Sequence, residues 1–274
     1  MDYPRNTLHP VTVHRNPLLI IIVCIIGTML TSLWFSYTPD TLLGKVDAVG
    51  YAVCHRIPSH SLTVEGRPLP LCARCSGMYL GALFGTIYQM ITGKRRGGFS
   101  RRALTFLCVF AIFFVIDGIN SFAGLILDHS PLYEPQNWLR LVTGMSVGLL
   151  ISAVLYPIFT QTVWQTWKPE SALNGHGVIA ALLTGSVLLV IGLLSGLPAI
   201  LYPLAILSVL GVLVILSLVY SVLLLMLFKQ ENRYNHFIEL TPAILGGLVL
   251  TMMQIGLFDL MRFLLTETWN GLPL

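Results

Sequence analysis

Long apolar segments separated by short polar ones run along the whole chain of 274 residues. A helix needs about 20 mostly apolar residues to cross the hydrocarbon of a bilayer, and seven segments approach or exceed this length with few charges. We predict membrane-spanning helices at 17–37, 76–92, 103–127, 138–159, 178–195, 199–228 and 242–265. The pattern therefore predicts an all-α fold, a polytopic bundle of about seven transmembrane helices in a lipid bilayer.

Two of these predictions depend on local signals. The tripeptide Gly196-Leu197-Pro198 separates two apolar runs, which indicates a helical hairpin, although a single kinked helix fits the same signal. The first apolar run, 17–37, is long and is not clearly followed by a small-residue cleavage site. We therefore interpret it as a retained membrane anchor and not as a signal peptide.

Only the first loop, about 38–74, is long, and it contains several prolines. A loop of this length in a compact protein is usually functional or disordered. We predict that it is ordered and covers one end of the bundle outside the membrane. The other loops are too short to hold a soluble catalytic domain.

The charges indicate how the bundle is oriented. Charged residues make up 10% of the chain, far below the roughly 25% of soluble proteins. Five basic residues lie between 94 and 102, and short basic loops face the cytoplasm. We therefore expect a cell-membrane protein whose N-terminus is cytoplasmic and whose long first loop lies on the outer side. The net charge of +4 reflects this topology, so we expect no nucleic-acid partner.

The first loop also carries most of the chemistry that the sequence offers. Cys54-His55 stands at one end of the loop and Cys72-Ala73-Arg74-Cys75 at the other, just before a predicted helix. A helix N-terminus lowers the pKa of a thiol and favours the thiolate, and Arg74 adds a fixed positive charge. A thiolate is both a nucleophile and a metal ligand.

Three kinds of chemistry fit these residues. Three cysteines and one histidine form a recognised zinc set, and zinc or iron is the expected ion. His55 follows Cys54 directly, and adjacent side chains diverge on an extended backbone, so His60 is an alternative fourth ligand. The second reading is thiol-disulfide exchange with a quinone as electron acceptor, and the third is a plain disulfide that closes the loop.

Ionisable groups inside predicted spans are a second signal, because their burial in a membrane is costly and usually serves a function. They gather toward the outer level of the bundle, near the cysteine loop. They are Asp117, Arg140, Asp259 and Arg262, and the polar Asn120 lies on the same helical face as Asp117. Asp117 either pairs with Arg140 or Arg74, and Asp259 with Arg262, to hold helices together, or these groups take part in the site directly.

A family resemblance rests on three stretches of this sequence. They are Cys54-His55-Arg56, the run from Pro70 to Gly81 that contains Cys72-Ala73-Arg74-Cys75, and Ile116-Asp117-Gly118 with Leu139-Arg140-Leu141-Val142-Thr143-Gly144. Together they resemble the predicted membrane proteins grouped as domain of unknown function 2085. The resemblance covers about 49–151 and implies one unit containing the cysteine cluster, Asp117 and Arg140. No established activity comes with it.

The resemblance suggests three regions and leaves several functions open. Residues 1–48 form an N-terminal segment with the first helix, 49–152 the family core, and 153–274 an additional C-terminal transmembrane module. The first hypothesis is a membrane protein with a metal-binding or redox centre. The alternatives are a structural subunit of a membrane complex with a disulfide staple, and a small-solute transporter. No motif decides whether the protein is an enzyme.

Overall fold

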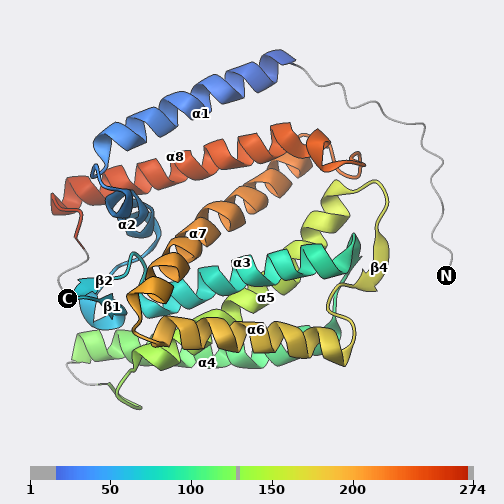
Figure 1. The fold of residues 1–274 in the computed structure, drawn as a ribbon. Coiled ribbons are helices and arrows are strands. Elements are labelled where there is room, and N and C mark those ends of the chain that lie inside the picture. The colour runs from blue at the N-terminus through green and yellow to red at the C-terminus, as the bar shows by residue number, and fades with distance from the viewer. Residues whose placement is uncertain (1–16, 128–129, 271–274) are drawn as a thin grey trace.

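A computed structural model describes residues 17–127 and 130–270, which form a bundle of helices (Figure 1). Within these residues the α-helices are α1 (Pro17–Tyr37), α2 (Leu42–Val53), α3 (Ala73–Gly93), α4 (Arg101–Leu127), α5 (Asn137–Val163), α6 (His176–Leu194), α7 (Pro198–Leu227) and α8 (Thr241–Thr266). The seven long helices occupy the seven predicted segments. Six of them, all except α3, are long and apolar enough to cross a membrane. The predicted helical membrane bundle is confirmed.

Helices α3 and α5 form the centre of the bundle, and glycine allows them to approach closely. A Cβ atom on Gly144 would lie 2.1 Å from the carbonyl oxygen of Arg74, and one on Gly148 would lie 2.1 Å from that of Met78. Small residues are typical where membrane helices pack backbone to backbone. The third helix at the centre, α7, also meets α3 through a glycine, Gly211.

The outer helices present apolar side chains away from the bundle. Helix α1 lies along α8, and large apolar side chains of α1, α4 and α6 are exposed (Figure 1). Soluble monomers rarely expose contiguous apolar patches of this extent. These surfaces therefore face lipid.

The turn between α6 and α7 forms a hairpin, as one of the two readings predicted. Gly196 adopts a left-handed backbone conformation with φ +70°, and Pro198 begins α7. Helix α6 ends and α7 begins at the same end of the bundle (Figure 1).

The long first loop is ordered, and we call residues 38–72 the cap. It contains the unpredicted helix α2, the 3₁₀ turn η1 (Pro58–His60), and the antiparallel pair β1 (Thr63–Val64) and β2 (Arg67–Pro68). Thr41 caps α2 by accepting the N–H of Gly44. Gly50 lets α2 lie against the end of the cap, because a Cβ there would be 2.1 Å from the carbonyl oxygen of Pro70.

The opposite end of the bundle has a different construction. Strand β3 (Arg96–Gly98) pairs in parallel with β4 (Lys168–Ser171), which joins the α3–α4 loop to the α5–α6 loop. A second 3₁₀ turn, η2 (Phe237–Leu240), precedes α8. We call the cap with the adjoining helix ends the cysteine end, and residues 94–102 with 168–176 the basic end.

Candidate metal centre

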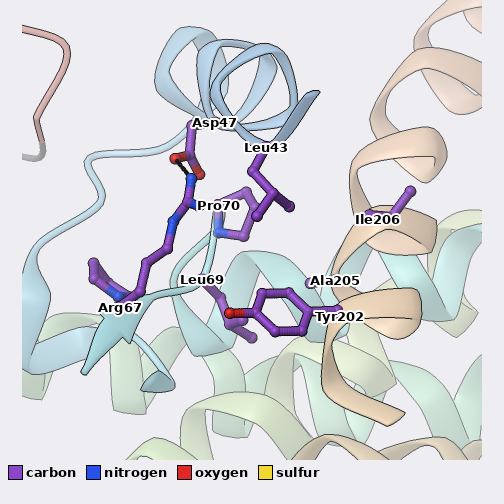
Figure 2. Close-up of a pocket in the computed structure, with 9 residues that line it drawn as sticks. Leu43, Asp47, Arg67, Leu69, Pro70, Tyr202, Ala205 and Ile206 are labelled. Atoms are coloured by element: carbon purple, nitrogen blue, oxygen red, sulfur yellow. Dashed lines mark hydrogen bonds and ion pairs between the residues drawn. The ribbon is translucent and has the colours of Figure 1, made fainter. Parts of the chain in front are cut away.

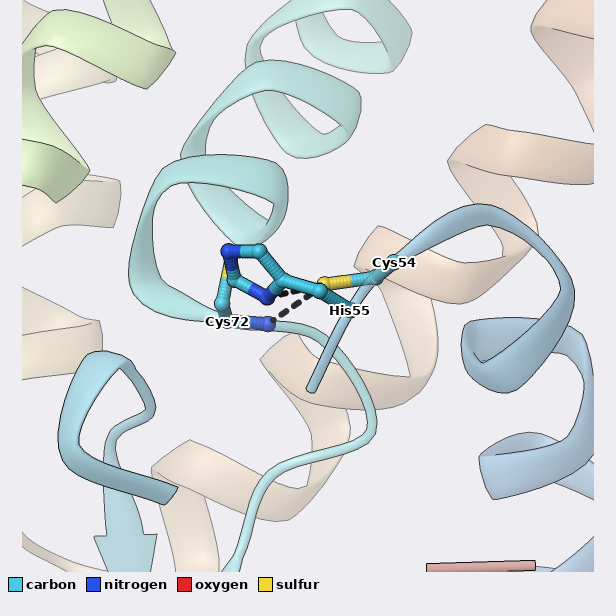
Figure 3. A group of neighbouring side chains, drawn as sticks. All are labelled: Cys54, His55 and Cys72. Carbon is cyan, nitrogen blue, oxygen red and sulfur yellow. Dashed lines mark hydrogen bonds between the residues drawn. The ribbon is translucent and has the colours of Figure 1, made fainter. Parts of the chain in front are cut away.

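The structure brings both halves of the cysteine motif together at the cysteine end (Figure 3). Cys54 follows the last residue of α2, and Cys72 is the N-cap of α3. One donor atom each from Cys54, His55 and Cys72 lies within 4.8 Å of the other two. These three side chains can therefore contact a single ion.

His55 contributes to this group although it follows Cys54 directly. The backbone of Cys54 is extended, so we expected the two side chains to diverge, yet the Cys54 sulfur lies 3.9 Å from His55 Nδ1. Arg56, the next residue, has φ 52° and turns the chain sharply after His55. The N–H of Ile57 then reaches His55 Nδ1 at 3.4 Å and fixes the ring.

The thiols of Cys72 and Cys75 lower the pKa of Cys54 by donating hydrogen bonds to its sulfur. Burial opposes this shift, and the backbone N–H of Cys72, 3.3 Å from the sulfur, supports it. The pKa of Cys72 is raised to about 12, chiefly because its thiol donates to Cys54. The neighbouring thiols therefore favour the thiolate form of Cys54.

His60, the alternative ligand, lies beside this group. Its ring meets that of His55 edge to face, with centroids 5.5 Å apart. Burial and then the nearby charge of Arg140 lower the pKa of His60 to about 4. The side chain is therefore a neutral neighbour of His55 at ordinary pH and does not belong to the compact donor group.

Arg262 of α8 holds the segment that carries the first two donors. Its guanidinium donates to the carbonyl oxygens of Cys54 at 2.6 Å, Tyr51 at 2.7 Å and His55 at 3.0 Å. It also lies 4.0 Å from the centroid of the Tyr51 ring. The final carbonyls of a helix are unpaired and carry partial negative charge. Because α2 has no basic residue in its last turn, α8 supplies the cation.

The expected ion pair between Asp259 and Arg262 does not form among the described residues. Asp259 instead accepts a 2.8 Å hydrogen bond from Trp34 Nε1 on α1. Arg262 is turned toward the backbone of the cap. Asp259 therefore ties α1 to α8, and Arg262 ties α8 to the cap.

Arg74 pairs with Asp117, which is one of the two pairings that the sequence suggested. The hydroxyl of Tyr133 donates to the other carboxylate oxygen of Asp117 at 2.8 Å, and Ser121 accepts from Arg74 at 3.2 Å. The guanidinium of Arg74 thus points to α4 and not to the thiols. Thiol donors and a backbone N–H, and not Arg74, are the causes that lower the pKa of Cys54.

Arg140 and Asn120 complete the buried polar layer. Arg140 donates to Asn137 Oδ1 at 2.8 Å and lies 3.5 Å from the Ser121 hydroxyl. Asn120 donates to the carbonyl of Tyr133 and accepts from the N–H of Leu132, so it fixes the loop after α4. These contacts place both residues in the helix packing around the donor group.

Sequence reasoning missed the acidic residue that organises the cap. Asp47 of α2 pairs with Arg56 at 3.0 Å and with Arg67 at 2.5 Å. Figure 2 shows Asp47 and Arg67 beside a small hollow of about 10 Å³, which leaves room for a single water at most. The available signal was the presence of two arginines in the cap, Arg56 and Arg67, each of which needs a carboxylate or carbonyl partner.

The long apolar helices and their exposed apolar faces define a multi-pass membrane protein. The family model described as "Predicted membrane protein (DUF2085)" matches residues 54–154. An uncharacterized protein of Methanocaldococcus jannaschii is 31% identical over 122 residues, which cover 44% of this chain and 72% of that protein. The chain belongs to this family.

A second relative supports the assignment. An uncharacterized protein of Methanothermobacter thermautotrophicus is 31% identical over 97 residues, covering 35% of this chain and 78% of that protein. No solved structure matches the chain. The family match spans Cys54, His55, Cys72 and Cys75. It also spans Arg74, Asp117 and Arg140, and it ends before α6, α7 and α8. Arg262 therefore reaches the donor group from outside the matched region.

Proposed function

We propose that this membrane protein binds one metal ion, zinc or iron, through Cys54, His55, Cys72 and Cys75. The observation that carries this proposal is the convergence of three donor atoms within 4.8 Å, with the Cys75 thiol beside them. Four protein ligands fill a tetrahedral shell and leave no open position. The ion then fastens the cap to the start of α3.

The distances are close to those of a zinc site. Zinc bonds of about 2.3 Å to sulfur and 2.0 Å to nitrogen place neighbouring ligand atoms about 3.5 Å apart in a tetrahedron. The observed 3.9 Å between the Cys54 sulfur and His55 Nδ1 requires only a small adjustment. Backbone N–H groups of Arg56 and Cys72 point at the same sulfur and stabilise its thiolate.

The surrounding charges also suit such a centre. A divalent ion with three thiolates and a neutral imidazole carries a net negative charge. Arg262 is bonded to the backbone of two of the ligands, and Arg140 is buried nearby in the polar layer. A buried anion is tolerated only when cations or hydrogen bonds compensate it.

Elemental analysis of the purified full-length protein tests the proposal. Wild type is expected to contain about one zinc or iron per chain, and Cys72→Ser or Cys75→Ser to lose most of it. Cys108→Ser is the matched control, because this thiol is exposed on the outer face of α4. Wild type that lacks stoichiometric metal after metal-supplemented expression would falsify the metal centre.

A thiol-redox centre is the second candidate, and the lowered pKa of Cys54 beside two further thiols favours it. In this case a quinone is the expected acceptor. Against it, Cys54 and Cys72 are buried, whereas reactive cysteines are usually partly accessible. Thiol trapping that finds an exchangeable disulfide in metal-free wild type, together with no bound metal, would support this candidate over the first.

The disulfide staple has less support. All five cysteines lie in the described part of the chain, and each is a free thiol there. The structural-subunit and transporter readings stay predictions. A mass spectrum of the unreduced protein with and without alkylation tests the staple, because two cysteines joined in an inert disulfide would not be alkylated.

We further propose that the cysteine end faces the outside of the cell and that the N-terminus is cytoplasmic. The basic loop residues gather at the opposite end, which supports this orientation. In intact cells, a membrane-impermeant thiol reagent is expected to label Glu65→Cys in the cap but not Lys229→Cys. The reverse pattern would invert the orientation.

A further inference from the structure

The basic end contains a cavity between the first turns of α4 and α6. Its volume is about 420 Å³. The lining residues are Phe99, Ser100, Arg101, Arg102, Ser171, Leu173, Asn174, Gly175, His176 and Ile179. Two arginines, hydroxyl and amide groups and a few apolar side chains thus surround it, and no carboxylate is among them.

The two arginines of this cavity differ from the arginines just before them in the chain. Arg95 stacks on Trp164 at 4.3 Å and donates to the carbonyl of Asn235, and Arg96 lies 3.6 Å from Glu170. Arg101 and Arg102 have no ion-pair partner among residues 17–127 and 130–270. Their charge is therefore available to a ligand.

Two helix ends add to the positive potential. Arg101 begins α4, and cations are normally unfavourable in the first turn, where the helix carries partial positive charge. Helix α6 begins beside the same cavity. Its N-cap is Gly175, with φ 104° and no side chain to accept the first N–H groups. The Ser100 hydroxyl accepts the N–H of Ala103 and caps α4, whereas α6 has no side-chain cap. These two helix starts and the two arginines meet with no carboxylate among the residues that line the cavity.

We propose that this cavity binds a phosphate group, with the headgroup of an anionic phospholipid as the expected carrier. Phosphate oxygens accept hydrogen bonds from guanidinium and from helix N–H groups. Phe99 and Ile179 supply an apolar wall, and the exposed apolar faces of α4 and α6 continue from the cavity along the bundle. An acyl chain has a surface to follow there. The site is independent of the proposed metal centre.

Lipid retention tests the site. The full-length protein is reconstituted in nanodiscs of phosphatidylcholine and phosphatidylglycerol, extracted into mild detergent, and its bound lipid is measured by native mass spectrometry. Wild type is expected to retain phosphatidylglycerol preferentially. In R101Q/R102Q this preference is expected to fall about 25-fold, since each basic residue near an anionic headgroup contributes about fivefold.

The matched control is K229Q/R233Q, which removes two exposed cations from the same end of the bundle but outside the cavity. It is expected to retain phosphatidylglycerol as wild type does. Equal losses in both double variants would overturn the proposal, because they would show a general effect of surface charge. Unchanged metal content and helical circular dichroism show that each variant is folded.

A second arm identifies the carrier of the phosphate. In lipid-depleted detergent, wild type is titrated with phosphatidylglycerol and, separately, with inorganic phosphate, and the melting temperature is followed. A shift with the lipid that R101Q/R102Q lacks supports the lipid carrier. A shift with phosphate at micromolar concentration, also absent from R101Q/R102Q, supports a free-phosphate site. A melting temperature that neither ligand changes in wild type overturns both.

Discussion

The two ends of the bundle use arginine in opposite ways. At the cysteine end, Arg140 is directed inward toward Ser121 of α4, and Arg262 toward backbone carbonyls of the cap. At the basic end, Arg101 and Arg102 are exposed and line an open cavity. A buried cation needs an anion or hydrogen-bond acceptors within the protein, whereas an exposed cation can bind a ligand or a lipid headgroup. This difference fits the proposals that the cysteine end holds a fixed metal centre and that the basic end contacts the membrane surface.

Removal of the metal should affect only one of these ends, and this is the largest effect that we expect. Binding to a structural zinc site contributes about 10 kcal/mol or more to folding of the segment it holds. Treatment with a strong chelator should raise the rate of tryptic cleavage after Arg56 in the cap by at least about tenfold. Cleavage after Lys229 and Arg233 should not change. Equal acceleration at both ends would mean that the ion does not act through the cap.

An ion pair at each end allows a second test. The Asp117 side chain is 1% exposed and pairs with Arg74, whereas Glu170 is 56% exposed and lies 3.6 Å from Arg96. Asp117→Asn should reduce the free energy of unfolding by about 2–4 kcal/mol, because it leaves a largely buried guanidinium unpaired. Glu170→Gln should cost less than about 1 kcal/mol. Unfolding in mixed detergent micelles measures both, and similar costs would contradict the difference in burial.

Two arginines that donate to backbone carbonyls form the third pair. Arg262→Gln should weaken metal affinity about 10- to 100-fold, as changes beside metal ligands commonly do, while the stoichiometry at saturating metal stays the same. Arg95→Gln removes a comparable ring contact and carbonyl bond at the basic end and should leave the affinity unchanged. Competition with a chromophoric chelator measures the affinity. Equal loss in both variants would assign Arg262 only a general role in stability.

The smallest expected effect concerns pH at the cysteine end. Burial lowers the pKa of His60 to about 4 from an ordinary value near 6.5, so the unfolded chain binds the proton more readily between these values. Stability should therefore fall by about 1–2 kcal/mol as the pH drops from about 6.5 to 4. His60→Gln in a Cys72→Ser background should flatten this decline. The background removes the competing effect of metal release, and an unchanged slope would exclude His60 as its source.

The architecture was largely predictable because the membrane imposes it. In lipid, an unpaired backbone N–H or C=O group has a large free-energy cost. Long apolar runs such as 17–37 and 242–265 therefore form helices, which pair these groups internally. The ordered first loop was predictable from its length and prolines. Helix α2 within it was not, because its 12 residues lie on a surface where tertiary packing, through Gly50 against Pro70, decides the conformation.

The candidate site was predictable in its residues but not in their relations. Cysteine spacing pointed to Cys54, Cys72 and Cys75, because a helix N-terminus favours the reactive, metal-binding thiolate form of a nearby cysteine. The approach of His55 Nδ1 to the Cys54 sulfur and the positive φ of Arg56 that follows it have no signal in the sequence. The hydrogen bonds of Arg262 span more than 200 residues. No local pattern identifies such a partner.

Helix α3 has a consequence for how the protein enters the membrane. It contains Cys75, follows Cys72 directly and packs through glycines against α5, yet it is the long helix that falls short of the apolarity needed to cross a bilayer alone. We expect the translocation machinery to insert it poorly as an isolated segment and efficiently once its neighbours are synthesised. The helix that begins at the proposed metal centre would then be the last of the core to insert, so assembly of that centre would occur only after insertion is complete.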